Sequence, residues 1–101
     1  MSKAATKLGR GLDAQAVTSA VAGTRSFPLT VQITNLSRQP VVLAQATPTL
    51  VIAAGDSAIH KCQTRAHLHD VIFGMIAVGD RLGHDIIGSI TTRLPREASK
   101  L

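Results

Sequence analysis

The sequence contains very few aromatic residues and a single cysteine. Its 101 residues include two phenylalanines, Phe27 and Phe73, and no tryptophan or tyrosine. The apolar fraction of 45% comes mainly from Ala, Val, Ile and Leu, which suit a β-sheet core but supply few of the large anchors that dominate binding hot spots. The lone Cys62 excludes an internal disulfide, so the composition implies no oxidising compartment.

Long hydrophobic runs are also missing. A membrane span needs roughly 20 apolar residues in a row, and no stretch approaches that length. Lys3, Lys7 and Arg10 near the start are followed by no apolar run of signal-peptide length. The length fits one small domain. We therefore expect a soluble chain made in the cytosol, with no membrane partner.

The residue patterns that carry catalysis are absent as well. The six acidic residues include no close pair, and Gly9-Arg10-Gly11 lacks the preceding strand and the remaining glycines of a phosphate-binding loop. A domain of this size also has little volume for a ligand pocket of ordinary dimensions. The sequence therefore predicts a protein that is not an enzyme and binds no cofactor.

The net charge of +5 is concentrated at the two ends of the chain. Residues 1–27 carry four basic side chains against one acidic, residues 93–101 carry three against one, and residues 28–92 are balanced at four against four. The basic ends are open to two interpretations: arms that lie on an acidic partner, or ordinary solvated termini. Because no aromatic residue is interleaved with the basic ones, nucleic-acid binding by base stacking is not expected.

Periodicity predicts the folded part. Leu29, Val31 and Ile33 alternate with polar residues, which is typical of a half-buried strand. Thr64 is a suitable N-cap and Gly83 a suitable C′ residue for a helix between them. Its apolar stripe has helical spacing and consists of Leu68, Val71, Ile72, Met75, Ile76, Gly79 and Leu82. The expected elements are strands at 29–34, 41–43, 49–53, 58–63 and 86–92 and a helix at about 65–82.

These elements define a mainly β, α+β fold class. The order β-β-β-β-α-β predicts a small antiparallel β-sandwich or partly open barrel with one helix. Residues 28–92 form the compact domain, residues 1–27 a basic flexible N-terminal arm, and residues 93–101 a basic C-terminal tail. A weak, Ala-rich helix is possible at about 12–21, but it would bury little area.

Partner-binding residues are expected on the arm and on the exposed face of the helix. Phe73 projects away from the apolar stripe, so it is either an interface residue or a single exposed apolar side chain. The candidate partner-binding residues are Lys3, Lys7, Arg10, Arg25, Phe27 and Phe73.

One group of residues has the chemistry of metal ligands. His60 and Cys62 share a face of the expected fourth strand, and imidazole and thiolate are ligands that zinc prefers. His67 and His69 point about 200° apart on a helix, so both could bind one metal only if the helix began after His69. The spacing matches no zinc signature, so the prediction is no metal, with His60 and Cys62 as the residual candidates.

One stretch resembles a known group of proteins. Val31-Gln32-Ile33-Thr34-Asn35, then Ser37-Arg38-Gln39-Pro40-Val41 and the Gly55-Asp56-Ser57 turn, is similar to small virion proteins of tailed bacteriophages. The resemblance covers about residues 29–92, and Ala54-Gly55 departs from the Pro-Gly found in many of those sequences.

The resemblance implies a structural protein of the virion, made in the host cytoplasm, that decorates or cements the capsid or the head–tail region. Its partner would be the major capsid protein or another virion protein, and a homo-oligomer is expected. On this hypothesis, deleting residues 1–25 removes partner contacts and leaves the domain folded. The alternative is a small regulatory binding module whose basic termini contact nucleic acid or an acidic protein; strong salt dependence would identify it.

Overall fold

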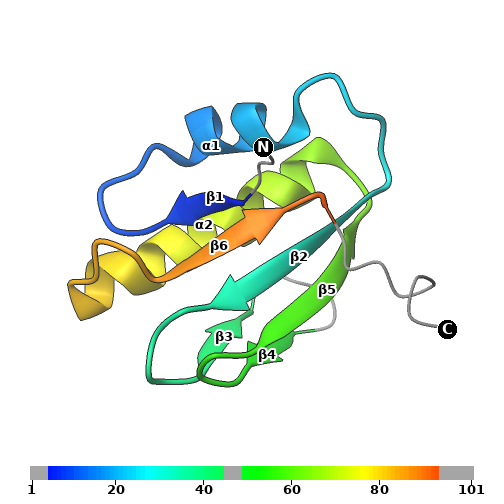
Figure 1. The fold of residues 1–101 in the computed structure, drawn as a ribbon. Coiled ribbons are helices and arrows are strands. Elements are labelled where there is room, and N and C mark those ends of the chain that lie inside the picture. The colour runs from blue at the N-terminus through cyan, green and yellow to red at the C-terminus, as the bar shows by residue number, and fades with distance from the viewer. Residues whose placement is uncertain (1–4, 45–48, 94–101) are drawn as a thin grey trace, which may run out of the picture.

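The computed structural model describes residues 5–44 and 49–93, and within them the chain forms two helices and six strands (Figure 1). The elements are β1 (Thr6–Leu8), α1 (Ala14–Ala22), β2 (Leu29–Asn35), β3 (Val41–Leu43), β4 (Leu50–Ile52), β5 (Ser57–Cys62), α2 (Arg65–Leu82) and β6 (Gly88–Thr91). The expected α+β class is correct. The helix expected at about 65–82 is α2, with Thr64 as its N-cap and Gly83, at a φ of 74°, as its C-cap.

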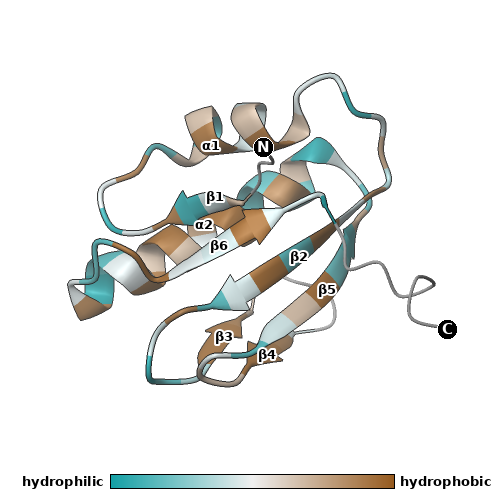
Figure 2. Cartoon of the chain, in the orientation of Figure 1, coloured by the Kyte–Doolittle hydropathy of each residue, from teal (hydrophilic) through white to brown (hydrophobic). Residues whose placement is uncertain are grey.

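Four strands form one antiparallel sheet in the order β1-β6-β2-β5, and β3 and β4 form a separate antiparallel hairpin. One face of the four-stranded sheet is buried, because Leu8, Val31, Ile33 and Ile90 are fully enclosed. Their sequence neighbours, such as Thr30 and Gln32, lie on the opposite, polar face. Figure 2 shows the same alternation along β2.

Helix α2 covers the buried face of this sheet. It contacts β1, β5 and the hairpin strand β3, and α1 packs beside it. Hydrophobic residues on α2 and on the inner sides of both sheets meet in a single core. The described strands close no barrel, and α2 lies against the inner face of the four-stranded sheet. The α+β class and the antiparallel strands are confirmed, whereas the sandwich or partly open barrel is not.

The N-terminal segment is the main correction to the sequence prediction. Residues 1–27 were expected to be a basic flexible arm, yet within the described part of this segment β1 pairs with β6 through Thr6↔Ile90 and Leu8↔Gly88. Leu8 is fully buried, and α1 buries Val17 and Val21 against the core. The order β-β-β-β-α-β and the single helix are therefore incomplete, because β1 and α1 precede them. Lys3 and most of the expected tail at 93–101 lie outside the described residues.

Close main-chain packing holds this segment in place. An added Cβ on Gly79 would lie 2.9 Å from the Arg10 nitrogen and 3.1 Å from the Gly9 carbonyl carbon. Gly79 therefore allows α2 to approach the chain just after β1, rather than the sheet alone. The Arg10 amide donates to the His84 carbonyl at 3.0 Å, and the Gly11 amide donates to the Asp80 carboxylate at 2.8 Å.

A buried asparagine joins the two sheets. Asn35 is fully enclosed, and its side-chain amide donates to the carbonyls of Gln39, Ile52 and Ala53 at 2.7, 2.9 and 3.3 Å. Its Oδ1 accepts from the Ser37 amide and hydroxyl at 2.9 and 2.7 Å. The Asn35-Leu36-Ser37 sequence thus fixes the hairpin to the end of β2, and the polar group is buried with its hydrogen bonds made.

Candidate functional site

The residues expected to bind a partner do not form one surface. Lys7 is exposed on the polar face of the sheet, because its neighbours Thr6 and Leu8 face the helices. Phe73 is 53% exposed on α2, which covers the other face, and it stacks on His69 with ring centroids 6.3 Å apart. Lys7 and Phe73 therefore lie on opposite sides of the molecule.

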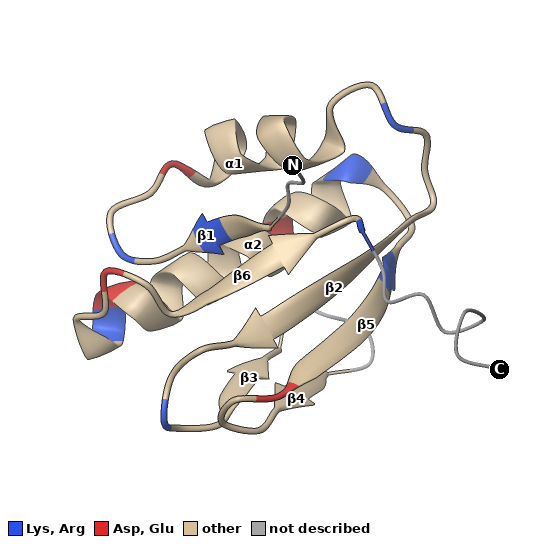
Figure 3. Cartoon of the chain, in the orientation of Figure 1, with Lys and Arg blue, Asp and Glu red and all other residues tan. Residues whose placement is uncertain are grey.

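The remaining candidates have intramolecular roles. Arg10 makes an ion pair with Asp85, with 2.7 Å between Nε and Oδ1. The Arg25 guanidinium donates to the Val21 carbonyl at 3.4 Å, and Phe27 is half-buried against the core. The basic side chains of the described residues are spread over β1, β5, α2 and several loops and do not gather in one place (Figure 3). Of the candidates among the described residues, Arg10, Arg25 and Phe27 thus contact other parts of the same domain.

The outer edge of β5 is the longest strand edge that the described residues leave unpaired. β2 and β6 each have neighbours on both sides, and at the other end of the sheet β1 has only three residues. No strand among residues 5–44 and 49–93 pairs with the outer side of β5, which has six residues. Unpaired edges of this kind are templates for adding a further strand.

The hydrogen-bond register shows which groups β5 offers at this edge. At the start of β5, Gly55 and Asp56 together oppose Asn35: the Gly55 amide donates to the Asn35 carbonyl and the Asn35 amide donates to the Asp56 carbonyl. This is a β-bulge with Gly55 at a φ of 78°. Because bonding alternates along an antiparallel pair, Ala58, His60 and Cys62 bond to β2. Their neighbours Ser57, Ile59 and Lys61 direct their amides and carbonyls outward.

Three potential metal ligands come together on the inner side of β5. His60 and Cys62 point from β5 toward α2, and His67 lies in the first turn of α2. One donor atom from each residue, taken together, forms a group in which no two atoms are more than 4.8 Å apart. The His60 and His67 Nε2 atoms are 2.8 Å apart and the ring centroids 5.1 Å apart. The two imidazoles thus meet nitrogen to nitrogen.

A short connection creates this cluster. Only Gln63 and Thr64 separate β5 from α2, and the Thr64 hydroxyl accepts a hydrogen bond from the His67 amide at 3.1 Å. The cap turns the helix back over the strand that precedes it, so His67 lies above His60 and Cys62. His67 and His69 point in different directions, as expected. His69 lies outside the cluster and stacks on Phe73, whereas His67 joins His60 and Cys62, which the sequence analysis did not predict.

Burial sets the protonation of the cluster. Cys62 is fully enclosed, and desolvation raises the pKa of its thiol from 9.0 to about 11, so the free thiol is neutral at physiological pH. Desolvation, and then the neighbouring His67, lower the pKa of His60 below its ordinary value of 6.5.

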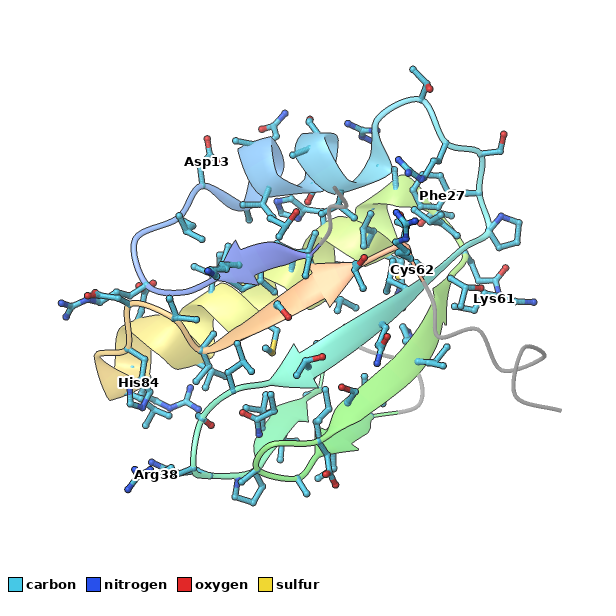
Figure 4. The ribbon with its side chains drawn as sticks, in the orientation of Figure 1. Asp13, Phe27, Arg38, Lys61, Cys62 and His84 are labelled. Carbon is cyan, nitrogen blue, oxygen red and sulfur yellow. The ribbon has the colours of Figure 1, made fainter. Side chains whose placement is uncertain are left out.

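Figure 4 places Cys62 with Phe27 and Lys61 at one end of the molecule and His84 at the other. His84 and Asp85 are therefore not part of the group.

Two further surface features complete the description. A groove of about 400 Å³ between α1 and α2 is lined by Gln15, Thr18, Ser19, Arg65, Ala66 and His69. It is bridged at one point, where the Arg65 guanidinium donates to the Ser19 hydroxyl at 3.0 Å. Neither described helix is long and apolar enough to cross a membrane.

Comparison with models of protein families, with curated proteins and with solved structures gave no match for this chain.

Proposed function

We propose that the chain is a structural component of a phage particle that binds its neighbours through the outer edge of β5, beginning with a second copy of itself. The observation that carries the proposal is this edge, where Ser57, Ile59 and Lys61 direct main-chain donors and acceptors outward. The virion assignment is supported by the similarity of residues 29–92 to small phage virion proteins, including the Asn35-Leu36-Ser37 turn.

The edge of β5 is complementary to itself. In a two-fold antiparallel pair centred on Ile59, each Ile59 faces its counterpart and each Ser57 faces the other copy's Lys61. Ile59, Ser57 and Lys61 are the outward-bonding residues, so this register joins donors to acceptors along the whole strand. In this register each Lys61 lies opposite a neutral Ser57 and not opposite another lysine. Lysine side chains on an edge strand otherwise oppose unspecific pairing. The two four-stranded sheets would then form one continuous sheet.

Ile59 contributes the apolar part of this contact. Its side chain is 53% exposed on the polar face of the sheet, next to the edge. A cross-strand pair of branched aliphatic residues contributes roughly 0.2–1 kcal/mol beyond the strand hydrogen bonds. The main chain therefore supplies most of the affinity, and Ile59 fixes the register.

A proline at position 59 tests the edge with little effect on the fold. The Ile59 amide points away from β2, so Ile59→Pro removes an outward donor and no internal hydrogen bond of the sheet. We expect this variant to fold and to be missing from purified phage particles when it replaces the natural chain. Ile59→Thr, which keeps the amide and the branched shape, is the matched control and should be incorporated.

The same experiment also shows which results would contradict the proposal. Absence of the unaltered chain from particles would contradict the virion role, and equal incorporation of both variants would contradict the edge. Binding to nucleic acid that weakens by orders of magnitude between low and moderate salt would instead support the regulatory module.

A further inference from the structure

We propose that His60, Cys62 and His67 form a zinc-binding site that joins the end of β5 to the first turn of α2. The inference does not depend on the virion role or on pairing at the β5 edge. It rests on three side chains of the right chemistry, on two rigid elements, with their donor atoms gathered within 4.8 Å.

The distances are close to those that zinc imposes. Zinc–nitrogen bonds of about 2.0–2.1 Å and tetrahedral angles place two ligating nitrogens about 3.3 Å apart, and a thiolate sulfur about 3.6 Å from each. The Nε2 atoms of His60 and His67 are 2.8 Å apart. The two rings must therefore separate by about half an ångström, and Cys62 must approach them by about one ångström at most. Both changes are on the scale of side-chain adjustments, so the proposal requires no rearrangement of β5 or α2.

The backbone around the site is already fixed. The carbonyl and amide of His60 and Cys62 bond to β2 through the pairs Val31↔His60 and Leu29↔Cys62. His67 is held by the Thr64 cap. Zinc would thus find its ligands largely ordered, and the entropic cost of assembling the site is small compared with that of a site built from loops.

Access and coordination number are consistent with a bound ion. Cys62 is fully buried, while His60 and His67 are half-buried, so the two rings lie between the sulfur and the solvent-exposed surface in extent of burial. The three side chains leave a fourth tetrahedral position for water or for a ligand from a binding partner.

Zinc would replace the hydrogen bond between the two rings. Without a metal, one Nε2 atom carries the hydrogen and the other accepts it. A zinc ion accepts both lone pairs at once. It also replaces the thiol proton of Cys62, so binding releases protons and strengthens as the pH rises.

The first experiment measures zinc binding to the full chain. Protein freed of metal with a chelator is titrated with zinc ion in competition with a chromogenic chelator, and melting temperature is recorded with and without zinc. We expect one equivalent of zinc and a rise in melting temperature, since an ion that binds only the folded state stabilises it. Loss of even an outer partner of a metal ligand costs 10–100-fold in affinity, so His67→Gln should weaken binding by more than about 100-fold.

His69→Gln provides the matched control. It makes the same change two residues away on α2, where the ring stacks on Phe73 outside the cluster. This variant should bind zinc as the unaltered chain does. Equal affinity of the His67→Gln variant and the unaltered chain would overturn the proposal, as would failure of the unaltered chain to bind one equivalent.

Cobalt substitution tests the sulfur directly. A tetrahedral cobalt site with a thiolate ligand shows a sulfur-to-cobalt charge-transfer band in the near ultraviolet, and Cys62→Ala should remove that band. Circular dichroism checks that the alanine variant is folded. If the alanine variant is not folded, zinc binding by the His67→Gln variant still tests the site, because His67 is only half-buried. A cobalt spectrum without the thiolate band in the unaltered chain would overturn the assignment of Cys62.

Discussion

The Nε2 atoms of His60 and His67 lie 2.8 Å apart, across the junction between β5 and α2. Seven positions separate these residues in the sequence, and only the reversal of the chain at Thr64 brings them together. The contact makes this end of the molecule sensitive to acid, because both rings cannot carry a charge at such a distance without repulsion.

The metal-free protein should lose stability in mild acid. The pKa of His60 is lowered from 6.5 by burial and then by His67, so the unfolded chain takes up this proton before the folded chain does. The stability of the fold is therefore not reduced by His60 above about pH 6.5. The free energy of unfolding decreases as the pH drops below this value through the lowered pKa. Urea unfolding at several pH values, with a chelator present, measures the decline.

Substituting His67 should reduce this acid sensitivity. His67→Gln removes the repelling ring and leaves the burial of His60, so the decline should be smaller but not absent. His69→Gln, the control, should behave as the unaltered chain does. An identical decline in all three proteins would show that contact between the two histidines does not contribute.

Truncating Asn35 should be strongly destabilising. Asn35→Ala removes the side-chain hydrogen bonds to three carbonyls and those from the Ser37 amide and hydroxyl. The Gln39 carbonyl keeps the Ser37 hydroxyl and the Ala53 carbonyl keeps the Asp56 amide. A buried group that is left unsatisfied costs about 1–3 kcal/mol. We expect a loss of about 3 kcal/mol in chemical denaturation, since some of these groups can reach water. Gln39→Ala is the control, because Gln39 bonds to Asn35 through its carbonyl. Similar stabilities of the two variants would contradict the role given to Asn35.

The N-terminal segment should contribute to the stability of the fold. Leu8→Ala removes a fully buried side chain from β1 and should cost about 2–5 kcal/mol. Leu12→Ala makes the same change at a residue that is 42% exposed and should cost less than about 0.5 kcal/mol. If both variants lost little and equal stability in thermal or chemical unfolding, this segment would instead be a flexible arm.

Deletion of residues 1–25 should then unfold the domain instead of leaving it intact. The deletion removes β1 and α1, with the buried Leu8, Val17 and Val21, and it exposes the edge of β6. Circular dichroism of the truncated chain measures the outcome. A cooperative unfolding transition like that of the whole chain would contradict it.

The elements that the sequence predicts well are those with local signals. The alternation of Leu29, Val31 and Ile33 marks β2, and α2 has both a long apolar stripe and caps at Thr64 and Gly83. The strand expected at 41–43 has the bounds of β3. The ends of the strands expected at 49–53, 58–63 and 86–92 differ from the observed ones by one or two residues, because strand ends depend on pairing partners.

The elements that the sequence missed depend on distant contacts. β1 has three residues and exists because β6, some 80 positions later, pairs with it. A weak helix was expected at about 12–21, close to the observed α1, but its apolar face of mostly alanine and valine predicts little burial until α2 is beside it. The grouping of three potential ligands was missed for a similar reason: His60 and Cys62 share a face through the period of the strand, but His67 joins them only through the turn at Thr64.

The mass of the purified protein in solution, from light scattering behind a sizing column, tests the central claim most directly. Pairing through the β5 edge predicts a dimer for the unaltered chain and for Ile59→Thr, and a folded monomer for Ile59→Pro. A monomer for the unaltered chain at every concentration tested would contradict the account, as would a dimer that survives Ile59→Pro.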